Sequence, residues 1–240
     1  IYGGVLQVEN AELVVRSGEA SGGGMWSPNQ TCGIAFDRGA TFTDSHVTVY
    51  AGDSDKKSIG IFADSTGAPA LTVNGGRLDV RSGHPMSKTA VVRAIELTGA
   101  LRTEAGSGAE ITATNGGTEQ AAITAAGGIT GFDYGVGVDS EKSTATAVYA
   151  NKNNDFMLTL TAQKSATSGG NTGGSTGGSS GGSGGSKTQP VVKIPISSGG
   201  SRDDLGGIIT GGKLIITPDR RVDFEDGDVV IGAHFTGDYD

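Results

Sequence analysis

The chain has 240 residues and carries 18 basic against 26 acidic side chains, a formal net charge of −8 at pH 7. Its 43 glycines and few leucines argue against a helical bundle, because glycine disfavours helices. The glycines have no Gly-X-Y period, which excludes collagen, and no apolar run is long enough to span a membrane. The basic residues form no cluster, so we expect neither nucleic acid nor an anionic membrane as a partner.

An internal repeat begins at the start of the chain. Residues 6–18, 40–52 and 71–83 superimpose without gaps: an apolar–polar alternation, a polar turn, a second alternation and a glycine. Alternation of period two between turn residues is typical of short β-strands. Residues 109–116 repeat part of the pattern, and residues 158–162 echo it a fifth time. The corresponding anchor positions are Leu13, Val47, Leu78, Ile111 and Leu158.

A second motif lies between copies of the first. Residues 33–37, Gly-Ile-Ala-Phe-Asp, recur at 60–64 as Gly-Ile-Phe-Ala-Asp. Each repeat therefore contains about three short strands joined by turns rich in Gly, Asn, Asp and Ser. A weak helical pattern is confined to residues 90–97.

This repeat predicts the fold class. A period of about 30 residues indicates stacked units that share one core. In the absence of a strong helical pattern, it predicts an all-β parallel β-helix, a β-solenoid of about 30-residue coils, for which the resemblance described below implies a right-handed coil. A β-propeller needs a longer period, and a two-sheet sandwich does not explain the gapless repeat. Gly75 and Gly76 should form a corner with positive φ, and Gly18, Gly52 and Gly83 recur at equivalent turns.

The clearest boundary is residues 168–186, where 10 of the 19 residues are glycine and the rest are Ser, Thr and one Asn. A segment without apolar side chains builds no core, so we expect a flexible linker. It follows a β-helix repeat domain, residues 1–167, and precedes residues 187–240, where short apolar runs alternate with turns. We interpret this last part as a short β-rich segment, a truncated second module, and the chain as a fragment of a longer one.

The repeat also carries a family resemblance. Residues 60–64 and 71–83 resemble the right-handed β-helix repeats of large surface and secreted proteins of gut-dwelling Gram-positive bacteria. Such proteins are described as carbohydrate-binding-domain-containing or pectin-lyase-like. The resemblance covers about residues 1–163. It implies an extracellular or cell-surface setting, in which this chain would be a monomeric module of a larger protein.

Because the pectin-lyase-like fold also hosts polysaccharide lyases and glycosidases, paired carboxylates are the first catalytic candidates. Asp37 and Asp64 occupy equivalent positions in consecutive coils, so they are candidates for such a pair or for a metal site. The simpler interpretation is that both end a strand and point to solvent. We align residues 91–94 with this position in the next coil, and they contain no acidic residue.

Sugar-binding sites often contain an exposed aromatic side chain. Trp26, in a loop, and Tyr50, at an outward position after a strand, are the candidates for carbohydrate binding. The three histidines have no metal-ligand spacing, and we expect His46 to be a surface residue. Cys32 lies in an apolar run and is predicted to be a small buried residue rather than a nucleophile. We predict no cofactor and no bound metal.

The most consistent function is that of a non-catalytic extracellular β-solenoid module that presents an adhesive or carbohydrate-binding surface. The expected partner is a glycan, such as a cell-wall or host-surface polysaccharide. A polysaccharide lyase or glycoside hydrolase of the β-helix type, and a purely structural stalk or spacer, are the two alternatives.

Overall fold

The computed structural model describes residues 1–20, 30–165, 192–195, 206–210 and 213–217. Within these ranges the chain forms β-strands and one 3₁₀ turn, η1 (Lys152–Asn154), and it contains no α-helix that is long and apolar enough to cross a membrane. The strands up to residue 102 are β1 (Tyr2–Glu9), β2 (Glu12–Arg16), β3 (Gln30–Tyr50), β4 (Lys57–Ala63), β5 (Ala70–Ser82), β6 (Val91–Leu97) and β7 (Leu101–Arg102). The later strands are β8 (Glu110–Asn115), β9 (Ala121–Ala125), β10 (Ile129–Thr130), β11 (Phe132–Tyr134), β12 (Ala147–Tyr149), β13 (Met157–Ala162), β14 (Val192–Pro195), β15 (Gly206–Thr210) and β16 (Lys213–Thr217).

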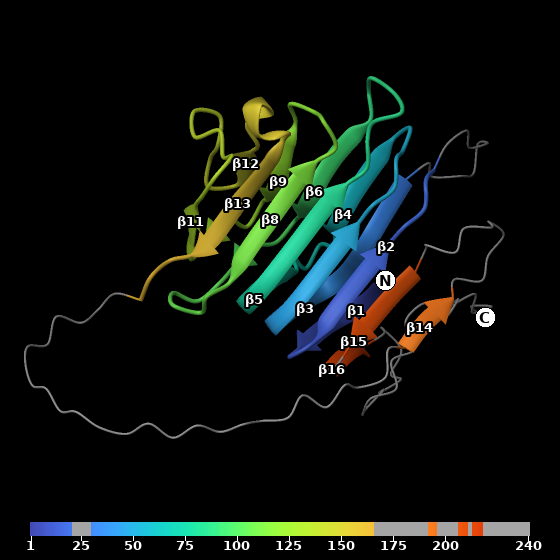
Figure 1. Cartoon of the computed structure of the whole chain (residues 1–240), viewed down its shortest axis with the longest axis vertical. Coiled ribbons are helices and arrows are strands. Elements are labelled where there is room, and N and C mark those ends of the chain that lie inside the picture. Colours follow the sequence, from blue (N-terminus) through green and yellow to red (C-terminus); the bar gives the residue numbers. More distant parts are fainter. Residues whose placement is uncertain (21–29, 166–191, 196–205, 211–212, 218–240) are drawn as a thin grey trace, which may run out of the picture.

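The strands stack as parallel ladders, so this part of the chain is a β-solenoid of about three turns (Figure 1). The 21-residue strand β3 covers one turn: its first part pairs with β4, and its later parts pair with β5. The next turn repeats this arrangement with β6, β7 and β8. The predicted β-solenoid is therefore confirmed, while the hand of its coil stays a prediction.

The register of the ladder follows the sequence repeat. Leu13 pairs with Val47, Val47 with Leu78, and Leu78 with Ile111, so four of the five anchors are confirmed. The prediction that the fifth anchor, Leu158, belongs to a further parallel turn is wrong. Leu158 lies in β13, which runs antiparallel to β8 and pairs with it in the opposite direction. A period-two alternation reads the same in both chain directions, so it predicts a strand but not its orientation.

The weak helical pattern at residues 90–97 does not correspond to a helix, because these residues pair in the β-ladder. Val91–Leu97 form β6, which pairs in parallel with β4 on one side and with β9 on the other. Pairing on both edges satisfies the backbone donors and acceptors of β6, and packing in this position outweighs a weak local preference.

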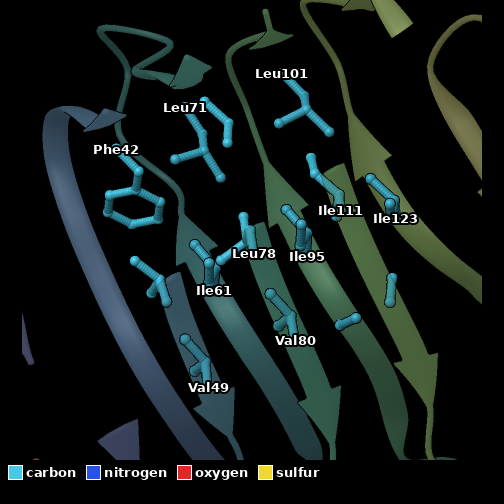
Figure 2. Close-up of a cluster of buried hydrophobic side chains, with 14 of the residues drawn as sticks. Phe42, Val49, Ile61, Leu71, Leu78, Val80, Ile95, Leu101, Ile111 and Ile123 are labelled. Carbon is cyan, nitrogen blue, oxygen red and sulfur yellow. The ribbon is translucent and has the colours of Figure 1, made fainter. Parts of the chain in front are cut away.

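The inward side chains form one continuous core along the solenoid. Figure 2 shows the stacked Leu71, Leu78, Ile95 and Ile111, all of which are fully buried. Complete burial of an aliphatic side chain of this size stabilises the fold by about 1.5–3 kcal/mol. Because each turn contacts only its neighbours, the stack as a whole, and not any single turn, holds the structure together.

Glycine serves two different purposes at the turns. Gly75 and Gly76 adopt φ angles of +81° and +71°, which confirms the predicted corner. At Gly52 and Gly83 the constraint is close approach. A Cβ on Gly52 would overlap the backbone of Gly18 in the preceding turn, and a Cβ on Gly83 would overlap that of Gly52. The column of glycines therefore lets successive turns stack at this corner.

Antiparallel strands cover both ends of the solenoid. At one end β13 pairs with β8, β11 with β13, and β12 with β9. At the other end β16 pairs with β1 and β15 with β2, and β14 pairs with β15 (Figure 1). The predicted linker, residues 168–186, and the part of the β-rich segment beyond residue 217 lie outside the described residues. That residues 187–240 are a truncated second module stays a prediction.

Candidate functional site

A groove of about 400 Å³ lies on the outer surface of β4, β6 and β9. Its centre is a row of outward residues in register across three turns: Glu96 pairs with Phe62 on one side and with Thr124 on the other. The parallel ladder therefore places side chains that are about 30 residues apart in the sequence next to one another. The groove is lined by Phe62, Ala63, Asp64, Arg93, Glu96, Leu97, Thr98, Thr124, Ala126, Thr146 and Ala147.

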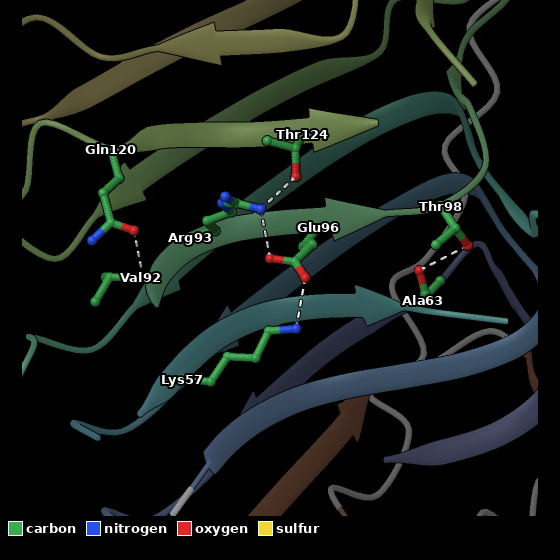
Figure 3. Close-up of polar contacts among 8 residues, drawn as sticks. All are labelled: Lys57, Ala63, Val92, Arg93, Glu96, Thr98, Gln120 and Thr124. Atoms are coloured by element: carbon green, nitrogen blue, oxygen red, sulfur yellow. Dashed lines mark hydrogen bonds and ion pairs between the residues drawn. The ribbon is translucent and has the colours of Figure 1, made fainter. Parts of the chain in front are cut away.

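A charged network extends across this row (Figure 3). Lys57 Nζ donates to Glu96 Oε1 at 2.6 Å, and Arg93 Nη1 donates to Glu96 Oε2 at 2.8 Å. Arg93 Nη1 also donates to Thr124 Oγ1 at 3.3 Å. The three charged side chains are between 20% and 29% exposed, so water screens them less than it screens a fully exposed pair. The network holds these polar groups in fixed positions along the groove.

Other contacts complete the groove. Lys57 Nζ lies 4.1 Å from the centroid of the Phe62 ring, a cation–π contact. Thr98 Oγ1 lies 3.2 Å from the carbonyl of Ala63, to which it donates. The buried Arg93 Nε has no hydrogen-bond partner among the described residues. The groove thus presents N–H donors and carboxylate and hydroxyl oxygens to a polar ligand.

The two predicted carboxylates stay at equivalent positions of consecutive turns, because the register that pairs Ile34 with Ile61 carries Asp37 onto Asp64. Asp64 is exposed and lines the groove. Asp37 is half-buried on β3, outside the groove lining, and its carboxylate accepts a hydrogen bond from the hydroxyl of Tyr2. The assignment of residues 91–94 as the matching position in the next coil is wrong: Ala63 pairs with Leu97, so Thr98 is equivalent to Asp64.

Of the two predicted sugar-binding aromatic residues, Trp26 lies outside the described residues. Tyr50 is half-buried at the end of β3, on the outer surface formed by β2, β3, β5 and β8. The guanidinium carbons of Arg16 and Arg81 lie 4.4 Å and 5.8 Å from the centroid of its ring. A sugar that stacks on Tyr50 therefore has to share the ring with an arginine.

A second polar cluster lies on the same surface as Tyr50. His46 Nε2 lies 3.0 Å from Asp79 Oδ2, and Arg77 Nε donates to Asp79 Oδ1 at 2.9 Å. Partial burial opposes ionisation of Asp79, but the hydrogen bonds from His46 and Arg77 outweigh it and hold the pKa of this carboxyl below its ordinary value. His46 is a surface residue, as predicted, with 48% of its side chain exposed.

Cys32 lies on β3 and is half-buried. Burial raises the pKa of its thiol to about 11, so the thiol is protonated at neutral pH and is a poor nucleophile. Among the described residues, no group of three or more His, Cys, Asp or Glu side chains is placed to hold a metal ion.

The groove network was accessible to sequence reasoning only through the correct register. Arg93 and Glu96 lie three residues apart on β6, but Lys57 lies on β4 in another turn, and no local motif links it to them. With residues 57–63 aligned on 91–97, Lys57 and Glu96 fall on adjacent strands, but Lys57 lies opposite Val91 and Glu96 lies opposite Phe62, so the pair is not a direct cross-strand neighbour.

The described residues thus form a β-solenoid with a groove on its outer surface. Searches found no match to the chain among protein-family models, curated proteins or solved structures.

Proposed function

We propose that this chain is a non-catalytic extracellular β-solenoid module of a bacterial surface or secreted protein, and that it binds carbohydrate in the groove over β4, β6 and β9. The groove is the observation that carries the proposal. It offers a row of donors and acceptors at fixed positions on a rigid sheet, with Arg93 and Glu96 at its centre and Asp64 and Thr98 in its lining.

A carbohydrate suits this arrangement because each sugar hydroxyl both donates and accepts hydrogen bonds. A carboxylate such as Asp64 accepts from hydroxyls, and the hydroxyl of Thr124 can both donate and accept. Because the sheet and the ion pairs hold the groove side chains in place, a ligand pays little to order them.

Binding without catalysis is favoured by how the carboxylates are used. Both oxygens of Glu96 already accept hydrogen bonds from cations, and Asp37 does not line the groove. A glycosidase needs two carboxyl groups that face each other across the scissile bond, one of them free to act as an acid. The extracellular setting rests on the resemblance of the repeat and on the Gly/Ser-rich composition of residues 168–186.

A glycan array probed with the full chain tests the proposal, followed by titration calorimetry of the best glycan. The double substitution Asp64→Asn and Thr124→Val removes two groove oxygens, and it should weaken binding about tenfold or more. The matched control is Asp133→Asn with Thr72→Val, an exposed aspartate and a half-buried threonine outside the groove lining. The control should bind like the original chain.

The outcomes separate the three functions. A folded chain that binds no glycan on the array would favour a stalk or spacer. Release of new reducing ends or unsaturated sugars from a polysaccharide, lost on Asp64→Asn, would show an enzyme and overturn the proposal. Equal binding by the groove variant and its control would place the sugar elsewhere.

A further inference from the structure

Three outward-facing residues form a row across β2, β3 and β5, on the side of these strands that faces away from the core. Arg16 pairs with Tyr50, and Tyr50 pairs with Arg81, so the aromatic ring lies between two arginines from neighbouring turns. Two strand spacings separate the arginine backbones by about 9.6 Å. The ring-centroid distances of 4.4 Å and 5.8 Å limit the separation of the guanidinium carbons to about 10 Å. The two arginines therefore reach the ring from the strands on either side of β3.

Neither arginine is neutralised by a carboxylate within the described part of the chain. Arg16 and Arg81 are exposed, and both contact the Tyr50 ring. Asp79, the acidic residue two positions before Arg81, has both oxygens occupied: Oδ1 by Arg77 and Oδ2 by His46. Two cations no more than about 10 Å apart thus remain available on this surface.

Stacking on an aromatic ring leaves the N–H groups at the edge of a guanidinium free. These groups form a planar fork that matches the two oxygens of a carboxylate or sulfate. Contact with Tyr50 also restricts both arginine side chains, which lowers the entropy lost when a ligand binds.

The spacing favours one ligand class. A polymer with repeated oxyanions can contact both guanidinium groups at any separation up to about 10 Å, whereas one small anion can do so only when they lie much closer together. Between the two charged groups that contact the arginines, the sugar rings of such a polymer carry hydroxyls that can hydrogen-bond to the Tyr50 hydroxyl. We infer that Arg16, Tyr50 and Arg81 form a second ligand site, separate from the groove, which binds an anionic polysaccharide through carboxylate or sulfate groups. This inference rests on the proposed carbohydrate-binding function and adds that the ligand is charged.

The test measures binding of the full chain to polygalacturonate, heparin and dextran by affinity electrophoresis and calorimetry. These probes carry carboxylates, sulfates and no charge, so they distinguish the two possible anionic groups from a neutral sugar. We expect binding to at least one anionic polymer, weakened about tenfold by Arg16→Gln or Arg81→Gln and more by the double variant. Arg81→Lys keeps the charge but loses the fork, and it should bind less tightly than the original chain.

The matched control is Arg102→Gln, an exposed arginine on β7 outside this row. It should leave binding unchanged, and circular dichroism checks that every variant is folded. Equal loss in Arg102→Gln and Arg81→Gln would mean general charge attraction and overturn the inference. Binding of a neutral glycan that is insensitive to Arg16 and Arg81 would retain the proposed function and overturn this site. Absence of binding to any glycan would overturn both.

Discussion

Replacing Leu78 with alanine should destabilise the solenoid strongly. Leu78 is fully buried in the central turn, where it pairs with Val47 on one side and Ile111 on the other, and both of these neighbours are also fully buried. Comparable Leu→Ala substitutions in protein cores cost about 2.7–5.0 kcal/mol, because the lost transfer energy adds to the cost of the cavity. Both neighbouring turns are held by backbone ladders and cannot collapse into the space, so we expect a loss of about 3 kcal/mol or more.

The assay is guanidinium denaturation of the full chain followed by far-ultraviolet circular dichroism, with a thermal melt as a second measure. A loss of 3 kcal/mol corresponds to a fall in Tm of about 6–12 °C for a domain of this size. Thr72→Ala, a half-buried outward position on the same strand, is the control and should change the free energy of unfolding by about 0.5 kcal/mol or less. A loss below about 1 kcal/mol for Leu78→Ala, or equal losses in both variants, would refute the stacked core.

Three further predictions concern backbone approach and pH. In the same denaturation assay, Gly60→Ala should lower the free energy of unfolding by about 1–3 kcal/mol, because its Cβ would lie 2.7 Å from the carbonyl oxygen of Ala94. The control Gly67→Ala should be tolerated, because its Cβ meets no close neighbour. Equal losses in the two variants would contradict this explanation. At pH 8 the thiolate fraction of Cys32 should be about 100-fold smaller than that of an ordinary thiol. Iodoacetamide should therefore alkylate the native chain far more slowly than the denatured chain. Equal alkylation rates would show an accessible, ordinary thiol. Because the folded-state pKa of Asp79 is lowered, its ionised form stabilises the fold fully above about pH 4, and this contribution is lost as the pH falls through the folded-state pKa. The stability difference between the original chain and Asp79→Asn should therefore shrink towards pH 3, and a difference that is constant with pH would contradict this account.

The repeat predicts the stacked turns well, because stacking imposes the same demands on equivalent positions of every turn. Leu13, Val47 and Leu78 fill the same place in the core, and each is a residue that fits a pleated inward surface. The glycine positions were predicted as turns, but the reason at Gly52 and Gly83 is contact between neighbouring turns, which only the three-dimensional arrangement shows.

The groove was harder to predict because the turns between strands differ in length. From β4 to β6 the offset between paired residues is 34, as in Ile61 with Ile95, whereas from β3 to β4 it is 27, as in Ile34 with Ile61. The position that matches Asp64 in the next turn is therefore Thr98, and residues 91–94 lie earlier on the strand. The Lys57–Glu96 ion pair joins two turns and depends on that register, so no pattern of neighbouring residues in the sequence predicts it.

The antiparallel strands at the ends have a consequence for growth. The outermost strand of a parallel solenoid exposes unpaired backbone groups, and it is a template on which further strands of another copy can add. Strand β13 occupies that position on β8, and its outer edge pairs with β11, which is only three residues long. Reversing the chain direction and then shortening the last strand leaves little straight edge for another molecule to extend. At this end the strands that complete the core also act as a terminator against fibre formation.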